Sequence, residues 1–463
     1  MKMKRIYLTL LLFMVCACSK DACLNPDNHI PGIIPIKDAL HSLDLFLSEK
    51  NLPQTKSGEI RSYNSVSTYY GEGLTTRADN ETSSGELPMA YIVNFENNEG
   101  FAVLGANEAM PDILAVTENG HINPSTLQVG GNENANNNVD RRMLFNDMDN
   151  SEIEEFNQSV VITTDSLYYS AEDEDYYSGT SGVDHLATAL IRQGIGSSYN
   201  QYFLEDFTEN PDLDNESGRY ASRSPMLSYS WSQGHPYNSY CKRGASKQKE
   251  AYTGCSTTAM AMIVAYNEFP QTLIINDTRI DYSGIKSGET AFVLNDTHQN
   301  QIALLMGGIY SKVKKVTTSG FTLITPKQIQ KCLKEFKYSN VSRICGSSLT
   351  SSMLSGISKM LSYSKPVFIS AIPKGIDNWK FGHSWVIDGA KYSSQNTYLL
   401  HMNLGWSASS NGYYSINCLN PARGEEYDDP GKVETDDDYY YSWHFRIITY
   451  DIPSNPSELS FNL

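Results

Sequence analysis

The stretch from Thr253 to Tyr266 is the strongest constraint on how this chain can fold, because a glycine turn leads directly into an apolar helical pattern. Gly254 permits a tight turn, and the small residues after Cys255 are typical of a helix start. Apolar side chains then recur at helical spacing until Pro270 ends the run. The pattern predicts a buried helix with Cys255 in its first turn.

A cysteine at this position is a candidate nucleophile. The positive end of the helix dipole favours the thiolate, the form of cysteine that attacks carbonyl carbon. The alternative is a small buried structural cysteine, which is the commoner case for a lone cysteine. The rest of the chain favours the nucleophile, because His383 lies 128 residues after Cys255 and Asn403 a further 20 residues on. Nucleophile, then histidine, then amide is the chain order of papain-like enzymes.

At 463 residues the chain is long enough for two or three domains. The stretch from Leu204 to Ser224 offers turns and charge but little to bury, which makes it the best domain boundary. Upstream of it, the pattern predicts helices in Ile36–Leu52 and Met143–Val161, a β-hairpin over Tyr91–Gly105 and a strand at Ile113–Thr117.

The downstream half reads as helices first and antiparallel strands later, which argues for an α+β domain with a cleft between two lobes. Besides the Cys255 helix, two helices are predicted, at Lys327–Phe336 and Met353–Leu361. The predicted strands are Val367–Ile372, Ser384–Ile387, Tyr398–Met402, Gly412–Ile416 and Phe445–Tyr450.

The N-terminus has the pattern of an export signal. Basic residues precede an apolar run from Ile6 to Ala17, which is too short to span a bilayer. The run ends in a sequence, Val15 to Cys18, that resembles a bacterial lipobox, where Cys18 would be lipidated and become the new first residue. We therefore expect an exported, membrane-anchored lipoprotein at the bacterial cell envelope, surface-exposed or released, with plain secretion as the alternative.

Charge and cysteine spacing exclude other classes. The formal net charge is −17 and no basic cluster follows the leader, so nucleic acid is not expected as a partner. The six cysteines beyond Cys18 form no C-x-x-C pair, and neither a metal nor a cofactor is expected. Cys332 and Cys345 could pair in an oxidising compartment, but their spacing does not establish a disulfide.

Four separated motifs resemble the streptopain family. They are Gln233–Asn238 (QGHPYN), the Gly254–Cys255 helix start, Gly382–Ala390 (GHSWVIDGA) and Asn403–Trp406 (NLGW). That family comprises secreted bacterial cysteine endopeptidases of papain-like fold, made as zymogens with an N-terminal inhibitory pro-domain. The resemblance covers about residues 222 to 463, and the strand region 88–120 is similar to part of the family's pro-domain.

The resemblance assigns a role to each motif. Cys255 would be the nucleophile and His383 the general acid and base, working as a thiolate–imidazolium pair. Gln233 would form the oxyanion hole with the Cys255 backbone N–H. Asn403 would help to orient the imidazole, and Trp406 would limit the access of water.

Three features depart from the family or could be mistaken for part of the site. Leu404 stands where relatives usually carry tryptophan, so one aromatic wall is lost. The acidic loop Gly424–Tyr441 lacks the ligand spacing of a calcium site and reads as a solvated loop. His235 reads as a loop residue despite its place near Gln233.

The predicted organisation is a signal peptide (1–17), a tether (18–35), an inhibitory pro-domain (36–215) and a catalytic domain (216–463). The fold class is α+β, a papain-like two-lobed cysteine protease domain preceded by a separate α+β pro-domain. Protein or peptide substrates are expected, with the pro-domain as intramolecular inhibitor. We expect activation by cleavage in the poorly packed stretch Arg219–Ser224, between about Asn215 and Met226. Two alternatives remain open: a cell-wall peptide amidase, and a catalytically impaired surface binding protein on the same fold.

Overall fold

The computed structural model of the chain describes the parts from which the architecture follows. The described residues are 32–48, 61–70, 73–74, 88–108, 110–122, 219–243, 249–317, 322–346, 349–372, 382–408, 411–416 and 443–463. The predicted signal, Cys18, the predicted helix at 143–161 and the acidic loop 424–441 lie outside these residues.

The N-terminal region, residues 32–122, is one helix laid on antiparallel strands. Its elements are α2 (Ile36–Ser48), β1 (Tyr63–Tyr70), β2 (Gly73–Leu74), β3 (Pro88–Phe95), β4 (Phe101–Gly105) and β5 (Ile113–Thr117). A short 3-10 turn, η1 (Glu96–Asn98), joins β3 to β4, and Gly100 takes a φ of 97° there, which suits glycine. The predicted helix, hairpin and third strand are confirmed.

The core of this N-terminal region is completed by the downstream half. Leu43 and Phe46 of α2 pack with apolar residues of β3, β4 and β5. Leu399 and Tyr413, which lie far downstream in the sequence, belong to the same buried cluster. The two halves therefore share apolar packing, and the Phe46 ring meets the Tyr413 ring edge-on at 5.5 Å.

Helices form one side of the downstream half. They are α6 (Cys255–Asn267), α7 (Tyr282–Ile285), η4 (Ala291–Val293), α8 (Asp296–Lys312), α9 (Pro326–Glu335) and α10 (Ser351–Ser362). Helix α6 is central, because every residue from Ser256 to Ala265 is buried and it packs against α7, α8, α9 and two strands. A helix that is apolar all round belongs inside a core. This confirms the predicted buried helix and places Cys255 at its first position.

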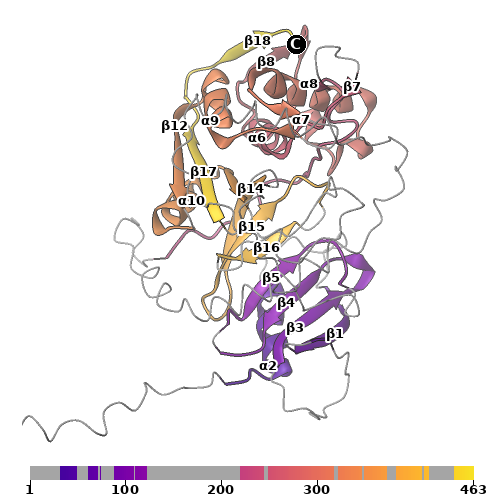
Figure 1. Cartoon of the computed structure of the whole chain (residues 1–463), viewed down its shortest axis with the longest axis vertical. Coiled ribbons are helices and arrows are strands. Elements are labelled where there is room, and N and C mark those ends of the chain that lie inside the picture. Colours follow the sequence, from indigo (N-terminus) through magenta and orange to yellow (C-terminus); the bar gives the residue numbers. More distant parts are fainter. Residues whose placement is uncertain are drawn as a thin grey trace, which may run out of the picture.

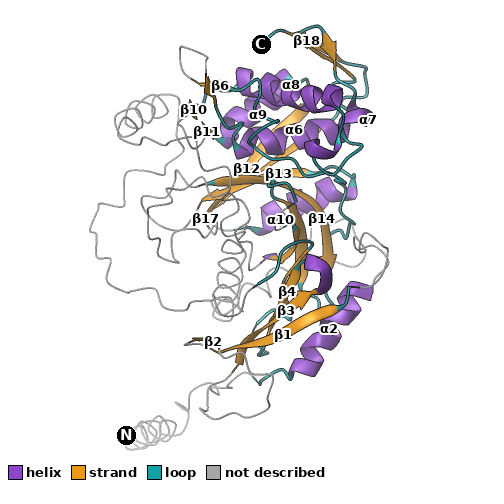
Figure 2. Cartoon of the chain, turned by 90° about the vertical axis from the view of Figure 1, so that its right-hand side faces the viewer, coloured by secondary structure: helices purple, strands orange, loops and turns teal. Residues whose placement is uncertain are grey.

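The strands of both halves form one antiparallel sheet. The downstream strands are β12 (Ser339–Gly346), β13 (Val367–Ile372), β14 (His383–Tyr392), β15 (Tyr398–Asn403), β16 (Gly412–Ser415) and β17 (Trp443–Asp451). Within the described residues, eleven strands run in the order β12-β17-β13-β14-β15-β16-β5-β4-β3-β1-β2. Figure 2 shows this sheet curving continuously from the helical part into the N-terminal region. The junction is β16 against β5, with Tyr413 opposite Val116.

Small sheets complete the described part. They involve β6 (Lys242–Arg243) with β7 (Lys249–Glu250), β10 (Val316–Thr317) with β11 (Thr322–Leu323), and β18 (Glu458–Phe461) with β8 (Thr272–Ile275) and β9 (Thr278–Arg279). Figure 1 shows α6, α8 and α9 at one end of the molecule and the N-terminal region at the other. The fold class predicted from the sequence, α+β, is confirmed.

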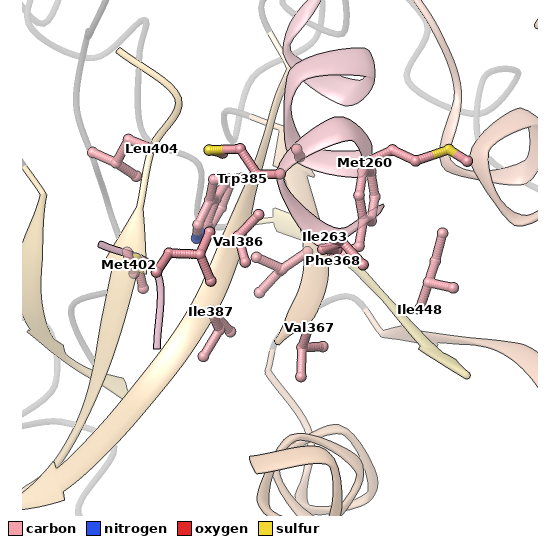
Figure 3. Packing of buried hydrophobic residues seen from close by; sticks show 14 of the residues in the cluster. Met260, Ile263, Val367, Phe368, Trp385, Val386, Ile387, Met402, Leu404 and Ile448 are labelled. Atoms are coloured by element: carbon pink, nitrogen blue, oxygen red, sulfur yellow. The ribbon is translucent and has the colours of Figure 1, made fainter. Parts of the chain in front are cut away.

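The central core lies between α6 and the middle of the sheet. Figure 3 shows Met260 and Ile263 of α6 beside Phe368 of β13 and the β14 side chains Trp385 to Ile387. Helix α10 contacts β12, β13, β14 and β17, and Figure 2 places it on the other side of the sheet from α6. Strand β14, which starts with His383, is thus packed on both faces, with nine of its ten residues buried.

The segment at 219–224 is better packed than the sequence predicts. Tyr220 is 6% exposed and its N–H donates to the Tyr392 hydroxyl at 3.0 Å. The N–H and carbonyl of Arg223 pair with those of Ala390 at 2.7 and 2.8 Å. The expectation that all of Arg219–Ser224 is poorly packed is therefore wrong, because this segment adds a bridge to the edge of β14.

The open question of a Cys332–Cys345 disulfide has a structural answer. Cys332 is buried on α9, whereas Cys345 is exposed on β12, and both are free thiols. A disulfide between them is absent from this structure.

Candidate active site

The position of Cys255 is set by the turn that precedes α6. Gly254 has a φ of 82°, and a Cβ atom there would lie 2.7 Å from the Thr322 carbonyl oxygen. The Gly254 carbonyl accepts from the N–H groups of Thr257 and Thr258 at 3.0 and 3.1 Å, which closes the first helical turn. The positive end of α6 therefore begins at Cys255, whose side chain keeps partial solvent exposure.

His383 is the first residue of β14 and is 5% exposed. Its Nε2 lies 3.0 Å from the Leu404 carbonyl oxygen. A carbonyl only accepts, so Nε2 carries the proton and Nδ1 is the acceptor of the neutral ring. The rings of Trp406 and Trp385 stack on the imidazole, with centroids at 4.4 and 5.7 Å. The histidine thus has a fixed tautomer in an aromatic setting.

A pair of serines joins the two elements that carry Cys255 and His383. Ser256 Oγ lies 2.9 Å from Ser384 Oγ, and both residues are buried. Ser256 donates its one hydroxyl proton to the Ile324 carbonyl at 2.9 Å, so Ser384 is the donor within the pair. Each serine directly follows a candidate catalytic residue, and their bond brings the start of α6 to the start of β14.

Asn403 lies beside this pair but bonds elsewhere. Its amide nitrogen donates to the Tyr229 carbonyl at 2.8 Å, and its oxygen accepts from the Ser230 hydroxyl at 2.8 Å. The sequence led us to expect that the Asn403 side chain orients the imidazole. In the structure the ring bonds instead to the backbone carbonyl of the next residue, Leu404. Asn403 instead anchors the segment that leads to Gln233.

Gln233 lies in a bend next to the turn that precedes Cys255. Its carbonyl accepts from the N–H of Thr253 at 3.1 Å, two residues before Cys255, and the residue is 7% exposed. This brings Gln233 close in space to Cys255, as the oxyanion expectation requires. His235 is exposed in the turn that follows, which agrees with its interpretation as a loop residue.

Trp406 and Leu404 frame the other side of the histidine. Trp406 is 4% exposed and stacks on His383, as its predicted role requires. Leu404 is fully buried in the central core, and Figure 3 shows it near Trp385. The loss of the family tryptophan thus leaves an aliphatic wall in place, while Trp385 and Trp406 supply the aromatic contacts.

Burial disfavours the charged forms of the candidate pair. Burial raises the pKa of the Cys255 thiol, and hydrogen bonds from Ser384 and then Ser256 only partly oppose this. Burial also lowers the pKa of His383 to about 3, against the raising effect of the Leu404 carbonyl. The expected thiolate–imidazolium pair is therefore disfavoured here, because charged groups lose their hydration in an enclosed site.

Within the residues that the structure describes, no group of three or more His, Cys, Asp or Glu side chains could hold a metal ion. Among the same residues, no helix is long and apolar enough to cross a membrane.

The sequence analysis missed the two serines and the Leu404 carbonyl. The serines had a signal, since Cys255-Ser256 and His383-Ser384 repeat the same residue after each candidate catalytic group. No sequence signal pointed to the Leu404 carbonyl, because every residue has a backbone carbonyl.

Comparisons with known proteins identify two regions of the chain. Residues 231–414 match the Peptidase C10 family, and residues 33–137 match the Spi protease inhibitor family. Residues 231–414 thus form a region of the Peptidase C10 (streptopain) family of cysteine peptidases, with an inhibitor-type region ahead of it.

Individual relatives cover parts of the chain. A streptopain of Streptococcus pyogenes serotype M28 is 27% identical over 267 residues, which is 49% of this chain and 65% of that protein. The thiol protease/hemagglutinin PrtT of Porphyromonas gingivalis is 27% identical over 230 residues, 44% of this chain and 24% of that protein. The chain thus spans less than two thirds of these relatives' length.

Two solved structures are also similar. A fragment of Prevotella intermedia prointerpain A matches with a TM-score of 0.44 and 16% identity, over 79% of this chain and 96% of that fragment. Active interpain A from the same organism matches with a TM-score of 0.39 and 21% identity, over 51% of this chain and 98% of that protein.

The serine pair leads to a test of the thiol. Ser384→Ala removes the hydroxyl that bonds the start of β14 to the start of α6 and so loosens the placement of Cys255 against His383. The rate of Cys255 alkylation by iodoacetamide at neutral pH should then fall by about tenfold, the effect of one hydrogen bond. Ser384→Thr keeps the hydroxyl and is the matched control. Equal rates in all three chains, measured by mass spectrometry of the Cys255 peptide, would remove Ser384 from this role.

Proposed function

We propose that the chain is a lipid-anchored cysteine endopeptidase made as a zymogen, with Cys255 as nucleophile and His383 as general acid and base. The observation that carries the proposal is the Ser256–Ser384 hydrogen bond, which holds the start of α6 against the start of β14. Membership of a cysteine peptidase family supports the reaction class. Because cysteine peptidases hydrolyse peptide bonds, the expected substrates are proteins or peptides.

The chemistry divides among the residues around the sulfur. His383 Nδ1 takes the thiol proton while Nε2–H stays on the Leu404 carbonyl, which fixes the ring plane. The Cys255 sulfur then attacks the scissile carbonyl carbon, and the oxyanion is stabilised by the Cys255 N–H and the Gln233 side-chain amide. The imidazolium gives its proton to the leaving amine, and water, activated by the same imidazole, hydrolyses the thioester. Trp406 limits the access of bulk water to the ring.

The N-terminal region would act as inhibitor and occupy residues 36–215, with the catalytic domain at 216–463. Its strand β5 pairs with β16, and Lys391 of β14 donates to the Phe46 carbonyl at 2.6 Å. Covalent linkage raises the effective concentration of such an inhibitor to roughly millimolar, so modest contacts suffice while the chain is intact. Cleavage removes that advantage.

Graded losses of activity test the assigned roles. Cys255→Ala and His383→Ala should each lower turnover of a casein substrate by about 10⁶, because each breaks the unit that makes the nucleophile. Gln233→Ala should cost roughly 10² to 10³, the effect of one oxyanion donor. Turnover above about a thousandth of wild type in either of the first two variants would refute the assignment. Hydrolysis of peptidoglycan but not of casein would point to an amidase instead.

Activation is expected to cut the chain at or upstream of Arg219. Arg219 is exposed, whereas the backbone of Arg223 is bonded on both sides to Ala390 and is a poor fit for a protease cleft. The intact precursor should be latent, and its active product should begin between about Asn215 and Tyr220. N-terminal sequencing of the active species checks this. Full activity in an uncleaved chain, or a start well before Leu204, would contradict it.

Lipid attachment at Cys18 is the proposed anchor, and the resemblance of Val15 to Cys18 to a lipobox supports it. Acyl chains would hold the protein at the cell envelope after the leader is removed. Cys18→Ala should shift the protein from the membrane to the soluble fraction in cell fractionation, with Cys23→Ala as the matched control. Membrane retention of the Cys18→Ala chain would require a different anchor.

A further inference from the structure

A buried histidine outside the active site bridges the two halves of the molecule. His401 of β15 is 2% exposed, and its Nδ1 lies 2.6 Å from Asp388 Oδ1 of β14. Its Nε2 lies 3.1 Å from Oε1 of Glu118, which follows β5 in the N-terminal region. One imidazole therefore contacts carboxylates from both halves.

The geometry fixes the charge of this histidine. Carboxylate oxygens accept hydrogen bonds, so both ring nitrogens must donate, and only the imidazolium carries two N–H groups. Asp388 is held ready as an acceptor, because its second oxygen takes the N–H groups of Met226 and Leu227 at 3.1 and 2.9 Å. A neutral imidazole would leave one of its two nitrogen–carboxylate contacts without a hydrogen-bonding proton.

Glu118 is also held through its backbone and by a second cation. Its N–H donates to the Asn411 carbonyl at 2.9 Å, which continues the pairing of β5 with β16. The Arg61 guanidinium attracts Glu118 and donates to the Thr117 carbonyl at 2.6 Å. His401 and Arg61 thus both attract Glu118 where the halves meet, and Arg61 is also attracted by Glu99.

We propose that Glu118 is the residue through which the catalytic half recognises its N-terminal region, with the Asp388–His401 pair as the receptor site for that carboxylate. The inference rests on the proposed inhibitory role of the N-terminal region. The partner that fits this surface is an extended strand that pairs with β16 and carries a carboxylate directly after its end. Strand β5 followed by Glu118 has that form.

The remaining groups around His401 do not compete for its charge. The Tyr413 ring meets the imidazole edge-on at 4.9 Å, and burial raises the pKa of Tyr414, so that hydroxyl stays neutral. The facing titratable groups are therefore Asp388 and Glu118, with Arg61 behind Glu118. The substitution Glu118→Gln replaces the carboxylate by an amide. It removes one negative charge and keeps the size and shape of the side chain.

The pH dependence follows from two opposite shifts. Burial lowers the pKa of His401, but Asp388 and then Glu118 outweigh it and raise the value to about 10. This contribution is complete below the ordinary imidazole range and is lost progressively as pH rises from there to about 10. Burial raises the pKa of Glu118, but His401 and Arg61 outweigh it and leave the value lowered. The Glu118 contribution is lost as pH falls below its ordinary range. Recognition is thus strongest from mildly acidic to neutral pH and weakens on either side.

Amide hydrogen exchange on the full chain tests the proposal without any need for activity. All variants are made in a Cys255→Ala background, which keeps the precursor intact. In Glu118→Gln, peptides covering residues 113–118 and 411–415 should exchange at least about tenfold faster at pH 7, the worth of a hydrogen bond to a charged group. Glu96→Gln makes the same chemical change at an exposed site of the same region and should leave the rates unchanged.

The other outcomes are also decisive. Glu118→Asp keeps the charge with a shorter reach and should fall between the wild type and Glu118→Gln. The difference between Glu118→Gln and wild type should persist at pH 5.5 and shrink only at stronger acidity. Equal rates in Glu118→Gln and Glu96→Gln, or faster exchange in α8 by the same factor, would overturn the proposal. A failure of the inhibitory role would show in the activity of the uncleaved chain and would leave these exchange rates as predicted.

Discussion

The burial of α6 is the constraint on which the rest of the structure depends. A helix that is enclosed along its length has no freedom to slide or turn, so its first residue, Cys255, is as fixed as the core itself. The same packing brings β14 alongside, and the bond between Ser256 and Ser384 sets the start of the helix against the start of the strand. A reactive group that needs accurate placement is thus positioned by apolar packing, and partial exposure is confined to the end of the helix.

The sequence predicted the elements whose pattern is strong and local. Residues Val367–Ile372 form β13 with the predicted bounds, and α6, α9, α10 and the β3–β4 hairpin agree within a few residues. Strongly apolar runs ended by proline or glycine left little ambiguity. The candidate site was predictable for a similar reason, because its side chains lie in short motifs that each begin or end an element.

The elements that were missed lack such a pattern. Helix α8 begins with six polar residues and contains Gly307 and Gly308, which lower helix propensity. Packing explains those glycines, since a Cβ atom at Gly307 would lie 2.5 Å from Tyr240 Cβ. The pairing of β5 with β16 joins residues almost 300 positions apart, and nothing local in either strand indicates its partner. Tertiary contacts, rather than local propensity, therefore determine both helix α8 and the pairing of β5 with β16.

Latency and catalysis place opposite demands on the same groups. The enclosed site favours a neutral Cys255 and a neutral His383, whereas attack on a peptide needs the thiolate. Hydrogen bonds from Ser384 and Ser256 already favour the thiolate, and a gain of water around the sulfur would act in the same direction.

A short chain of hydrogen bonds links the N-terminal region to His383. Glu118 donates its N–H to the Asn411 carbonyl, and the Asn411 side chain accepts from the N–H of Leu404 at 2.9 Å. The Leu404 carbonyl in turn holds His383. Glu118 is therefore three hydrogen bonds away from the His383 ring. Because Asn411 stays bonded to Leu404 within the catalytic half, loss of Glu118 would free the outer end of this chain while leaving the histidine's tautomer set.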